Sequence, residues 1–322
     1  MRGFCRHINS VIFMRIQKKM WQPLVRRVFG GLIGRQLPKP VVRALGGLAY
    51  AVSGRYRQVA DKNLRIAYGD SMTEAERDTL IRRVFQSFAI STAEFLEAPR
   101  WTPEQVKALA QADSYEVVDK VLARGKGMIL LAAHFGNWEL LARRAAVAGY
   151  SFAVIARQSE DAGFNEITDS LRANGGYTVL PRGGSPKPIL SRLRSNGIIA
   201  ILPDQKSEDL FVPFFGKLAG TVAGPAVLAL KTGAGIVPMF CPRQPDGTYK
   251  MVIYSEIDTT ATGDTDADIK RIMTDATAVI EEMVRKYPEQ WLWLHDRWRV
   301  PPPAELLQQE KSADAPPAAA AA

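Results

Sequence analysis

The sequence has few of the residues that build metal sites and disulfide frameworks. Its 322 residues include two cysteines and three histidines. Cys5 and Cys241 stand alone, without the paired spacing of a zinc site or of a disulfide-stapled domain. The histidines are scattered, at His7, His134 and His295. We therefore expect no metal site, and a chain of this length buries roughly three quarters of its unfolded surface without such staples.

Long hydrophobic runs are also missing. The longest uncharged run of the N-terminal segment covers residues 44–54, and as a helix it would reach about 17 Å, against about 30 Å of bilayer hydrocarbon. No other run reaches the roughly 18 apolar residues that a spanning helix needs. Basic residues interrupt the segment too often for a secretory signal peptide. The sequence therefore predicts neither a spanning helix nor a cleaved leader.

Acidic residues are scarce at the N-terminal end. Residues 1–69 hold 14 Lys and Arg and a single acid, Asp61, whereas residues 70–322 hold 28 Lys and Arg and 32 Asp and Glu. The net charge of +9 therefore comes from the N-terminal segment alone. Such an asymmetry indicates a basic arm that binds an anionic surface, either nucleic acid or lipid headgroups.

The basic segment also carries an apolar stripe at helical spacing. The stripe consists of Val25, Val28, Phe29, Leu32 and Ile33. Two interpretations are open, an interfacial membrane helix or a helix packed on the protein's own core. The missing acids favour the anionic membrane surface. No nucleic-acid partner is expected, because the segment has no helix-turn-helix or RNP-like motif.

The rest of the chain predicts an α/β fold with a mixed, mostly parallel sheet flanked by helices. Four short apolar runs read as buried strands, at residues 128–132, 152–156, 198–202 and 236–240. Helical stretches alternate with them, and capping boxes at Thr73–Glu76 and Thr102–Gln105 begin two earlier helices. We expect a membrane-associating segment at 1–57, a catalytic domain at 58–303 and a disordered Pro/Ala-rich tail at 304–322.

The most informative stretch follows the first predicted strand. His134 comes at the carboxyl end of that strand, where ligands bind in open α/β sheets, and a helix begins near Asn137. Glu139 is placed to accept a hydrogen bond from one imidazole nitrogen, which would leave the other as a base. Gly136 allows close backbone approach, and the helix N-terminus offers N–H groups to an anion. The other interpretation is a capped helix with a structural histidine.

Several blocks resemble one enzyme family. His134 to Glu139 (H-F-G-N-W-E) is similar to the H-x4-D/E motif of glycerolipid acyltransferases. Pro203–Gln205, then Val212–Gly216 with Thr221, and finally residues 287–298 (Y-P-E-Q-W-L-W-L-H-D-R-W) resemble further blocks of the bacterial lipid A biosynthesis acyltransferases. The resemblance spans roughly residues 20–300 and implies a glycerolipid-acyltransferase-like fold with an N-terminal helical, membrane-associating segment.

The resemblance implies transfer of a fatty acyl group to a hydroxyl of a lipid-linked sugar. The donor is the thioester of acyl carrier protein or coenzyme A, with no other cofactor. His134 is then the general base and Glu139 its orienting partner. Arg157 and Arg172 fall where the family carries arginines, to bind an oxyanion or an acceptor phosphate, or they are plain surface residues. Asp204 binds the substrate hydroxyl, orients the histidine, or is simply a turn residue.

Aromatic residues supply further candidates for the substrate pocket. Phe135, Trp138, Phe214 and Phe215 line an acyl channel or belong to the core. The block with Trp293, His295 and Arg297 shapes the acceptor site or closes the sheet, and His295 is the second candidate base.

The family points to the cytoplasmic face of the inner membrane. Other acceptors stay open, such as a phosphatidylinositol mannoside or a lysophospholipid. A non-enzymatic protein that binds anionic membranes is the alternative of a different class.

Overall fold

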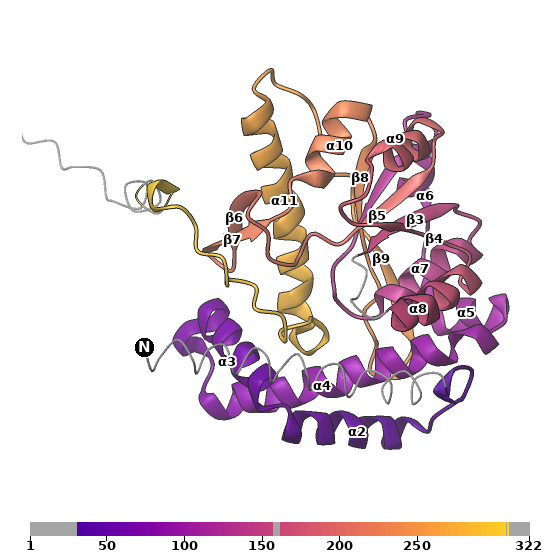
Figure 1. Ribbon diagram of the computed structural model, residues 1–322, viewed down its shortest axis with the longest axis vertical. Coiled ribbons are helices and arrows are strands. Elements are labelled where there is room, and N and C mark those ends of the chain that lie inside the picture. The colour runs from indigo at the N-terminus through magenta and orange to yellow at the C-terminus, as the bar shows by residue number, and fades with distance from the viewer. Residues whose placement is uncertain (1–30, 157–161, 307, 309–322) are drawn as a thin grey trace, which may run out of the picture.

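The computed structural model describes residues 31–156, 162–306 and 308 (Figure 1). A central sheet carries helices on both faces, and three N-terminal helices form a layer along one end of the molecule. Several predictions lie outside the described residues, namely those for residues 1–30, for Arg157 and for most of the 304–322 tail.

The sheet is mixed and mostly parallel, as predicted. Its seven strands lie in the order β1-β9-β8-β2-β5-β3-β4. The strands from β8 to β4 are parallel to one another, whereas β9 runs antiparallel to β8 and parallel to β1. The bounds are β1 Ala110–Ala112, β2 Met128–Leu131, β3 Phe152–Ala156, β4 Thr178–Pro181, β5 Ile198–Ile201, β8 Gly235–Phe240 and β9 Tyr249–Ile253.

Burial on both faces explains why the central strands are continuous apolar runs. In β2, Met128 and Leu130 pack in one core, which also takes in residues of α5, α6 and α7. Ile129 and Leu131 point to the other core, shared with α10 and α11. The helices are α5 Pro103–Leu109, α6 Glu116–Leu122, α7 Trp138–Val147, α8 Ala162–Asn174, α9 Lys187–Arg194, α10 Gly224–Thr232 and α11 Thr265–Lys286.

The N-terminal layer consists of α2 Lys39–Val52, α3 Gly54–Tyr68 and α4 Glu74–Glu97. The predicted capping box begins α4, where the Glu76 backbone N–H donates to Thr73 Oγ1 at 3.3 Å and the Glu76 carboxylate accepts from the Thr73 backbone N–H at 2.8 Å. Helix α2 packs closely on α4 at Gly46, where a Cβ atom would lie only 2.8 Å from the Cα of Gln86. Short 3-10 turns cover Gly69–Ser71, Ala98–Arg100 and Pro288–Gln290.

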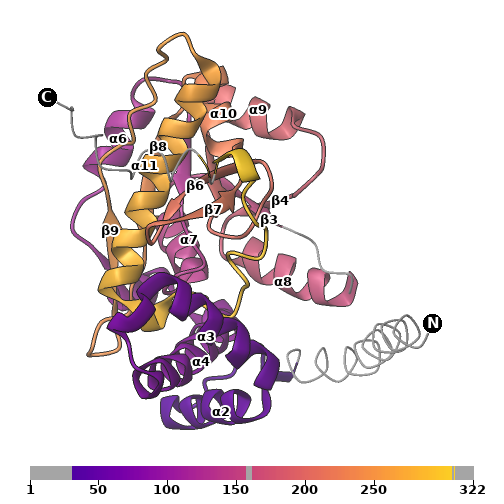
Figure 2. The ribbon, with the colours of Figure 1, turned by 90° about the vertical axis from the view of Figure 1, so that its left-hand side faces the viewer.

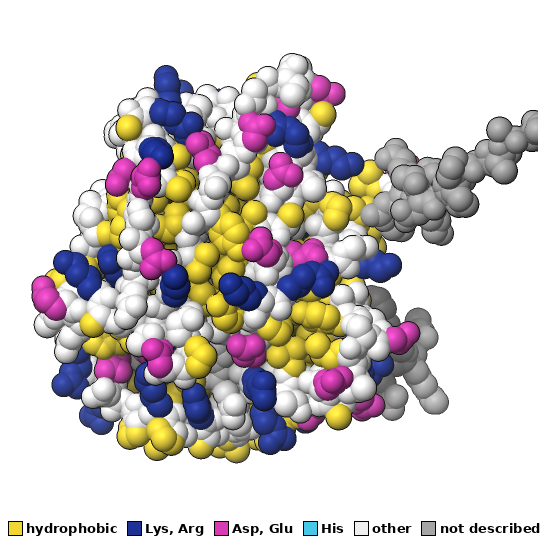
Figure 3. Space-filling model, turned by 180° about the vertical axis from the view of Figure 1, so that it is seen from behind, with side chains coloured by type: hydrophobic (Ala, Val, Ile, Leu, Met, Phe, Trp, Pro, Cys, Tyr) yellow, Lys and Arg dark blue, Asp and Glu magenta, His cyan; other side chains and the backbone are white. Residues whose placement is uncertain are grey.

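The outer face of α2 is apolar and exposed. Val41, Leu45, Leu48 and Val52 follow one stripe of the helix and are 48 to 74% exposed. Figure 3 shows hydrophobic side chains along the lower edge, where Figure 1 places α2, with Lys and Arg beside them. Within the described part of the chain, no helix combines the length and the apolar character needed to cross a bilayer.

A hairpin of two strands was not predicted. Strands β6 (Leu210–Phe214) and β7 (Lys217–Thr221) are antiparallel and lie beside α11 (Figure 2). Phe215 and Gly216 connect them with φ of 54° and 68°, the left-handed pair that a two-residue hairpin turn requires. The V-P-F-F-G motif is therefore the first strand of this hairpin and its turn.

Candidate active site

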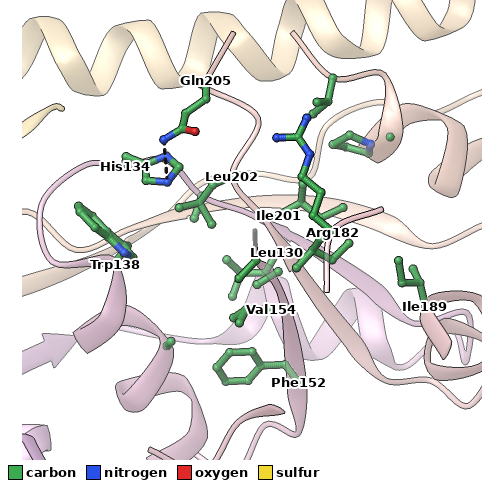
Figure 4. Close-up of a pocket in the computed structure, with 18 of the residues that line it drawn as sticks. Leu130, His134, Trp138, Phe152, Val154, Arg182, Ile189, Ile201, Leu202 and Gln205 are labelled. Atoms are coloured by element: carbon green, nitrogen blue, oxygen red, sulfur yellow. Dashed lines mark hydrogen bonds between the residues drawn. The ribbon is translucent and has the colours of Figure 1, made fainter. Parts of the chain in front are cut away.

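A cavity of about 610 Å³ opens at the carboxyl ends of the parallel strands. Its volume lies within the roughly 300–1,000 Å³ of small-molecule sites. Leu130, Phe152, Val154 and Ile201 make its wall apolar, and His134 stands at one end of it (Figure 4). Polar side chains at the edge include Gln205 and Arg182. The arrangement suits a long apolar ligand whose polar end meets the histidine.

The register of two neighbouring strands brings His134 to Asp204. Leu131 of β2 pairs with Ile201 of β5. His134 lies three positions after Leu131, and Asp204 lies three positions after Ile201. The His134 backbone N–H donates to Asp204 Oδ2 at 2.8 Å, and its Nδ1 lies 2.9 Å from Asp204 Oδ1. Residues 70 positions apart in sequence thus form one unit.

Asp204 holds the imidazole in one tautomer. Its side chain is buried, which opposes ionisation, but the charge of His134 and hydrogen bonds from His134 and Trp291 outweigh burial and keep the pKa of Asp204 below its usual value. The Trp291 Nε1–H donates to Oδ2 at 2.9 Å. Because an ionised carboxylate only accepts, Nδ1 carries the proton and Nε2 presents a lone pair. His134 therefore has the geometry of a general base.

Glu139 is not the partner that its spacing predicted for His134. Its carboxylate accepts from Arg172 Nη2 at 2.7 Å and from the Tyr177 hydroxyl at 2.6 Å. Burial lowers the pKa of Arg172, but the charge of Glu139 and its hydrogen bonds raise it more, so the pair stays ionic. The orienting role falls to Asp204 instead, which was one of the roles considered for it. Glu139 and Arg172 both line the cavity, and their part in catalysis stays a prediction.

Gly136 and Asn137 shape the loop and do not offer their N–H groups to an anion. The Gly136 N–H donates to Gln290 O at 2.9 Å, and the Asn137 N–H donates to Cys241 O at 3.0 Å. Gly136 has φ of 59°, and a Cβ there would lie 2.3 Å from Cys241 O. Asn137 Oδ1 caps α7 by accepting the Leu140 N–H at 2.9 Å.

A buried ionic cluster supports this loop from behind. Asn137 Nδ2 donates to Glu94 Oε2 at 2.9 Å, and Glu94 also accepts from Arg243 and from the Tyr249 hydroxyl at 2.5 Å each. The carboxylate therefore ties α4 to the segment after β8 and to β9. The loop that carries His134 rests on residues from separate parts of the chain.

Of the predicted pocket aromatics, only Trp138 lines the cavity. Its ring lies edge-on to the His134 imidazole, with centroids 5.4 Å apart. Phe135 packs against Phe240. Phe214, Phe215 and Trp293 are buried in an aromatic cluster around Trp291. Phe135, Phe214 and Phe215 therefore lie in the core, as one of their two interpretations had it, and Trp293 lies there with them.

His295 holds the loop after Asp204, and Arg297 holds strand β7. His295 Nε2 accepts the Lys206 backbone N–H at 3.2 Å, and burial lowers the pKa of His295 to about 4, so it is a neutral acceptor. Arg297 donates to Gly220 O, and burial lowers its pKa to about 10. Neither residue lines the cavity, and His295 Nε2 is engaged with the Lys206 N–H, so it is not free to act as the base.

Three residues of the site were not singled out from the sequence. Gln205 belongs to a quoted block, so its motif was visible but its role was not. Tyr177 and Arg182 flank β4, a strand that the sequence pattern did not predict. Among the described residues, no group of three or more His, Cys, Asp or Glu side chains is arranged to hold a metal ion.

Fold and site together define an α/β enzyme with a His–Asp pair at the carboxyl edge of a parallel sheet, beside an apolar cavity. Comparison with known proteins gives the family. Residues 21–300 match the bacterial lipid A biosynthesis acyltransferases, and the chain belongs to that family.

Named relatives include two kinds of acyltransferase. The lipid A biosynthesis lauroyltransferase of Escherichia coli K12 is 26% identical over 83% of this chain and 88% of its own length. The phosphatidylinositol mannoside acyltransferase of Mycolicibacterium smegmatis is 27% identical over 84% and 89%. The E. coli lipid A biosynthesis palmitoleoyltransferase is 25% identical over 84% and 89%. The protein is thus an acyltransferase.

Proposed function

We propose that this acyltransferase moves a fatty acyl chain from a thioester of acyl carrier protein or coenzyme A to a hydroxyl of a lipid-linked sugar, such as a lipid A precursor. The strongest support is that His134, with its Nε2 lone pair, lies at one end of an apolar cavity. An acyl chain fills the cavity, and its thioester carbon then lies near the base. No covalent enzyme intermediate is required, because the acceptor hydroxyl attacks directly.

The proposed reaction needs one proton transfer in each direction. His134 Nε2 takes the proton of the acceptor hydroxyl as its oxygen bonds to the thioester carbonyl carbon. Asp204 stabilises the imidazolium that forms, as the buried carboxylate of a catalytic triad does. The tetrahedral oxyanion then collapses, the C–S bond breaks, and the leaving thiolate takes the proton back from His134. The products are an ester and a free thiol, so atoms and charges balance.

We also propose that the enzyme acts at the cytoplasmic face of the inner membrane. The exposed stripe of Val41, Leu45, Leu48 and Val52 supports it, because apolar patches of this kind mark interaction sites. Lys39 and Arg43 lie on the same helix, and the first acidic residue of the chain is Asp61. Apolar residues beside basic ones suit a layer of anionic headgroups.

A phosphatidylinositol mannoside is the second candidate acceptor. Relatives named for that acceptor and for lipid A are about equally similar to this chain, at 27% and 26% identity. Both acceptors place a sugar hydroxyl at a membrane surface, so the same site geometry serves either one. A lysophospholipid is the third acceptor to test.

Acyl transfer in detergent micelles tests the proposal. Each acyl thioester is offered with each of the three acceptors, and the product is identified by mass spectrometry. We expect His134→Ala to abolish transfer, while the exposed carboxylate variant Asp113→Asn keeps the wild-type rate. Wild-type rates in His134→Ala, or transfer to none of the acceptors by the wild-type protein, would contradict the proposal.

A further inference from the structure

The side chain of Gln205 touches the nitrogen that must do the chemistry. Its Nε2 lies 3.3 Å from His134 Nε2, and the two side chains face each other at one end of the cavity (Figure 4). The orientation of the amide follows from the chain of hydrogen bonds. Asp204 is an acceptor, so His134 Nδ1 is a donor and His134 Nε2 is an acceptor. The Gln205 group that faces Nε2 must therefore be the donating NH2.

The Gln205 amide occupies the position beside His134 Nε2 that the acceptor hydroxyl must take. A general base has to lie within hydrogen-bond reach of the proton it removes. The lone pair of His134 Nε2 is a single acceptor site, and the amide occupies it in the free protein. An incoming hydroxyl therefore displaces the Gln205 amide. The displaced NH2 group then lies beside the reacting oxygen, with a donor free.

The developing oxyanion needs such a donor, and three neighbouring candidates are engaged. The Gly136 and Asn137 backbone N–H groups donate to protein carbonyls. Arg172 is bound to Glu139 through both Nε and Nη2. Water-excluded donors aimed at the developing charge are usually the largest electrostatic contribution to such a reaction.

The loop that carries Gln205 is held on both sides. The Thr221 hydroxyl donates to Pro203 O at 2.8 Å, and the Lys206 N–H donates to His295 Nε2 at 3.2 Å. The Ser207 N–H reaches Gly220 O at 3.3 Å. The backbone of Gln205 is therefore fixed between anchored neighbours, and only its side chain has to move.

We propose that Gln205 is a catalytic residue whose side-chain amide passes from the lone pair of His134 Nε2 to the thioester oxygen as the acceptor hydroxyl enters. The proposal rests on the acyl transfer proposed above. It also gives His295 a function as a positioning residue, since its neutral imidazole anchors the backbone one residue beyond Gln205.

Gln205→Met tests this, because it keeps the approximate length of the side chain and removes its donor. The loss of one oxyanion donor lowers kcat by about 100- to 1,000-fold. We expect this fall in Gln205→Met, with the KM for the acceptor within about threefold of wild type. Gln111→Met, at an exposed position of β1, is the matched control and keeps wild-type kcat. A kcat within threefold of wild type in Gln205→Met, or a loss carried by KM alone, would overturn the proposal.

A second measurement does not depend on activity. The 15N resonance of His134 Nε2 in the free protein should move in Gln205→Met and stay in place in Gln111→Met, with the thermal unfolding midpoint unchanged. An unmoved resonance overturns the role of Gln205 by itself. Absence of acyl transfer in the wild-type protein with a moved resonance would instead count against the proposed reaction, and with it the catalytic role.

Discussion

Replacing Asp204 by asparagine should reverse the tautomer of His134. Oδ2 accepts two N–H groups, from the His134 backbone and from Trp291, whereas Oδ1 accepts one, from the imidazole. An asparagine NH2 at the Oδ2 position would face both donors and lose both hydrogen bonds. Each loss costs about 1–3 kcal/mol, so the amide oxygen takes that position with a preference of roughly 2–6 kcal/mol.

The amide NH2 of the introduced asparagine then faces His134 Nδ1 and requires it to accept. The proton moves to Nε2, which loses the lone pair that a base needs. We expect Asp204→Asn to lower kcat by about 10,000-fold, the loss seen when a triad aspartate is replaced by asparagine. Asp204→Ala imposes no tautomer. Its kcat should therefore be about tenfold higher than that of Asp204→Asn, although Asp204→Ala loses more hydrogen bonds.

Thiol release from an acyl thioester in the presence of acceptor measures both variants. Circular dichroism and thermal unfolding check that each protein is folded, and Asp113→Asn is the control for a neutralised surface carboxylate. More than a tenth of the wild-type kcat in Asp204→Asn would refute the tautomer argument. A kcat for Asp204→Ala below that of Asp204→Asn would show that hydrogen bonding, and not the tautomer, decides the rate.

Three further predictions concern stability and membrane binding. Gly136→Ala adds a Cβ 2.3 Å from Cys241 O at a φ of 59°, so the free energy of unfolding in urea should fall by about 3 kcal/mol or more; a loss below about 1 kcal/mol would mean that the loop relaxes. Because burial lowers the pKa of His295 from 6.5 to about 4, the folded state binds this proton more weakly than the unfolded chain. Stability should therefore fall as the pH drops from 6.5 to 4, by at most about 3 kcal/mol and less after solvent screening; His295→Gln should flatten this slope, and an unchanged slope would contradict the assignment. Leu45→Asp with Leu48→Asp should abolish sedimentation with phosphatidylglycerol vesicles while kcat in micelles is kept, and full retention on the vesicles would exclude α2 as the contact.

The two capping boxes and the central strands of the sheet were predicted correctly. The capping boxes at Thr73 and Thr102 involve residues three positions apart, so spacing alone identifies them. The central strands are buried on both faces, and their apolar runs follow from that. Strand β4 escaped prediction because its side chains are half-buried or exposed, and the β6–β7 hairpin because its motif was read as chemistry rather than as a turn.

The sequence singled out His134 and named both Glu139 and Asp204 as possible partners, without deciding between them by geometry. His134 stands at a strand end that the sequence marks clearly. Glu139 is five residues away and was the natural choice, but a helix that begins at Trp138 directs it towards Arg172 and Tyr177. The contact of Asp204 with His134 follows only once the register of Leu131 with Ile201 is known. A single sequence does not show which residues pair between strands that lie far apart in the chain.

The C-terminal segment gives the enzyme an order of assembly. The last strand of the described sheet ends at Ile253, yet Trp291, Leu292 and His295 make the bonds that hold the His134 and Asp204 loops. A chain still on the ribosome, with these residues in the exit tunnel, has its strands but no fixed base. The geometry of the site is therefore completed last in synthesis, and an interrupted chain that ends before residue 291 should lack acyltransferase activity.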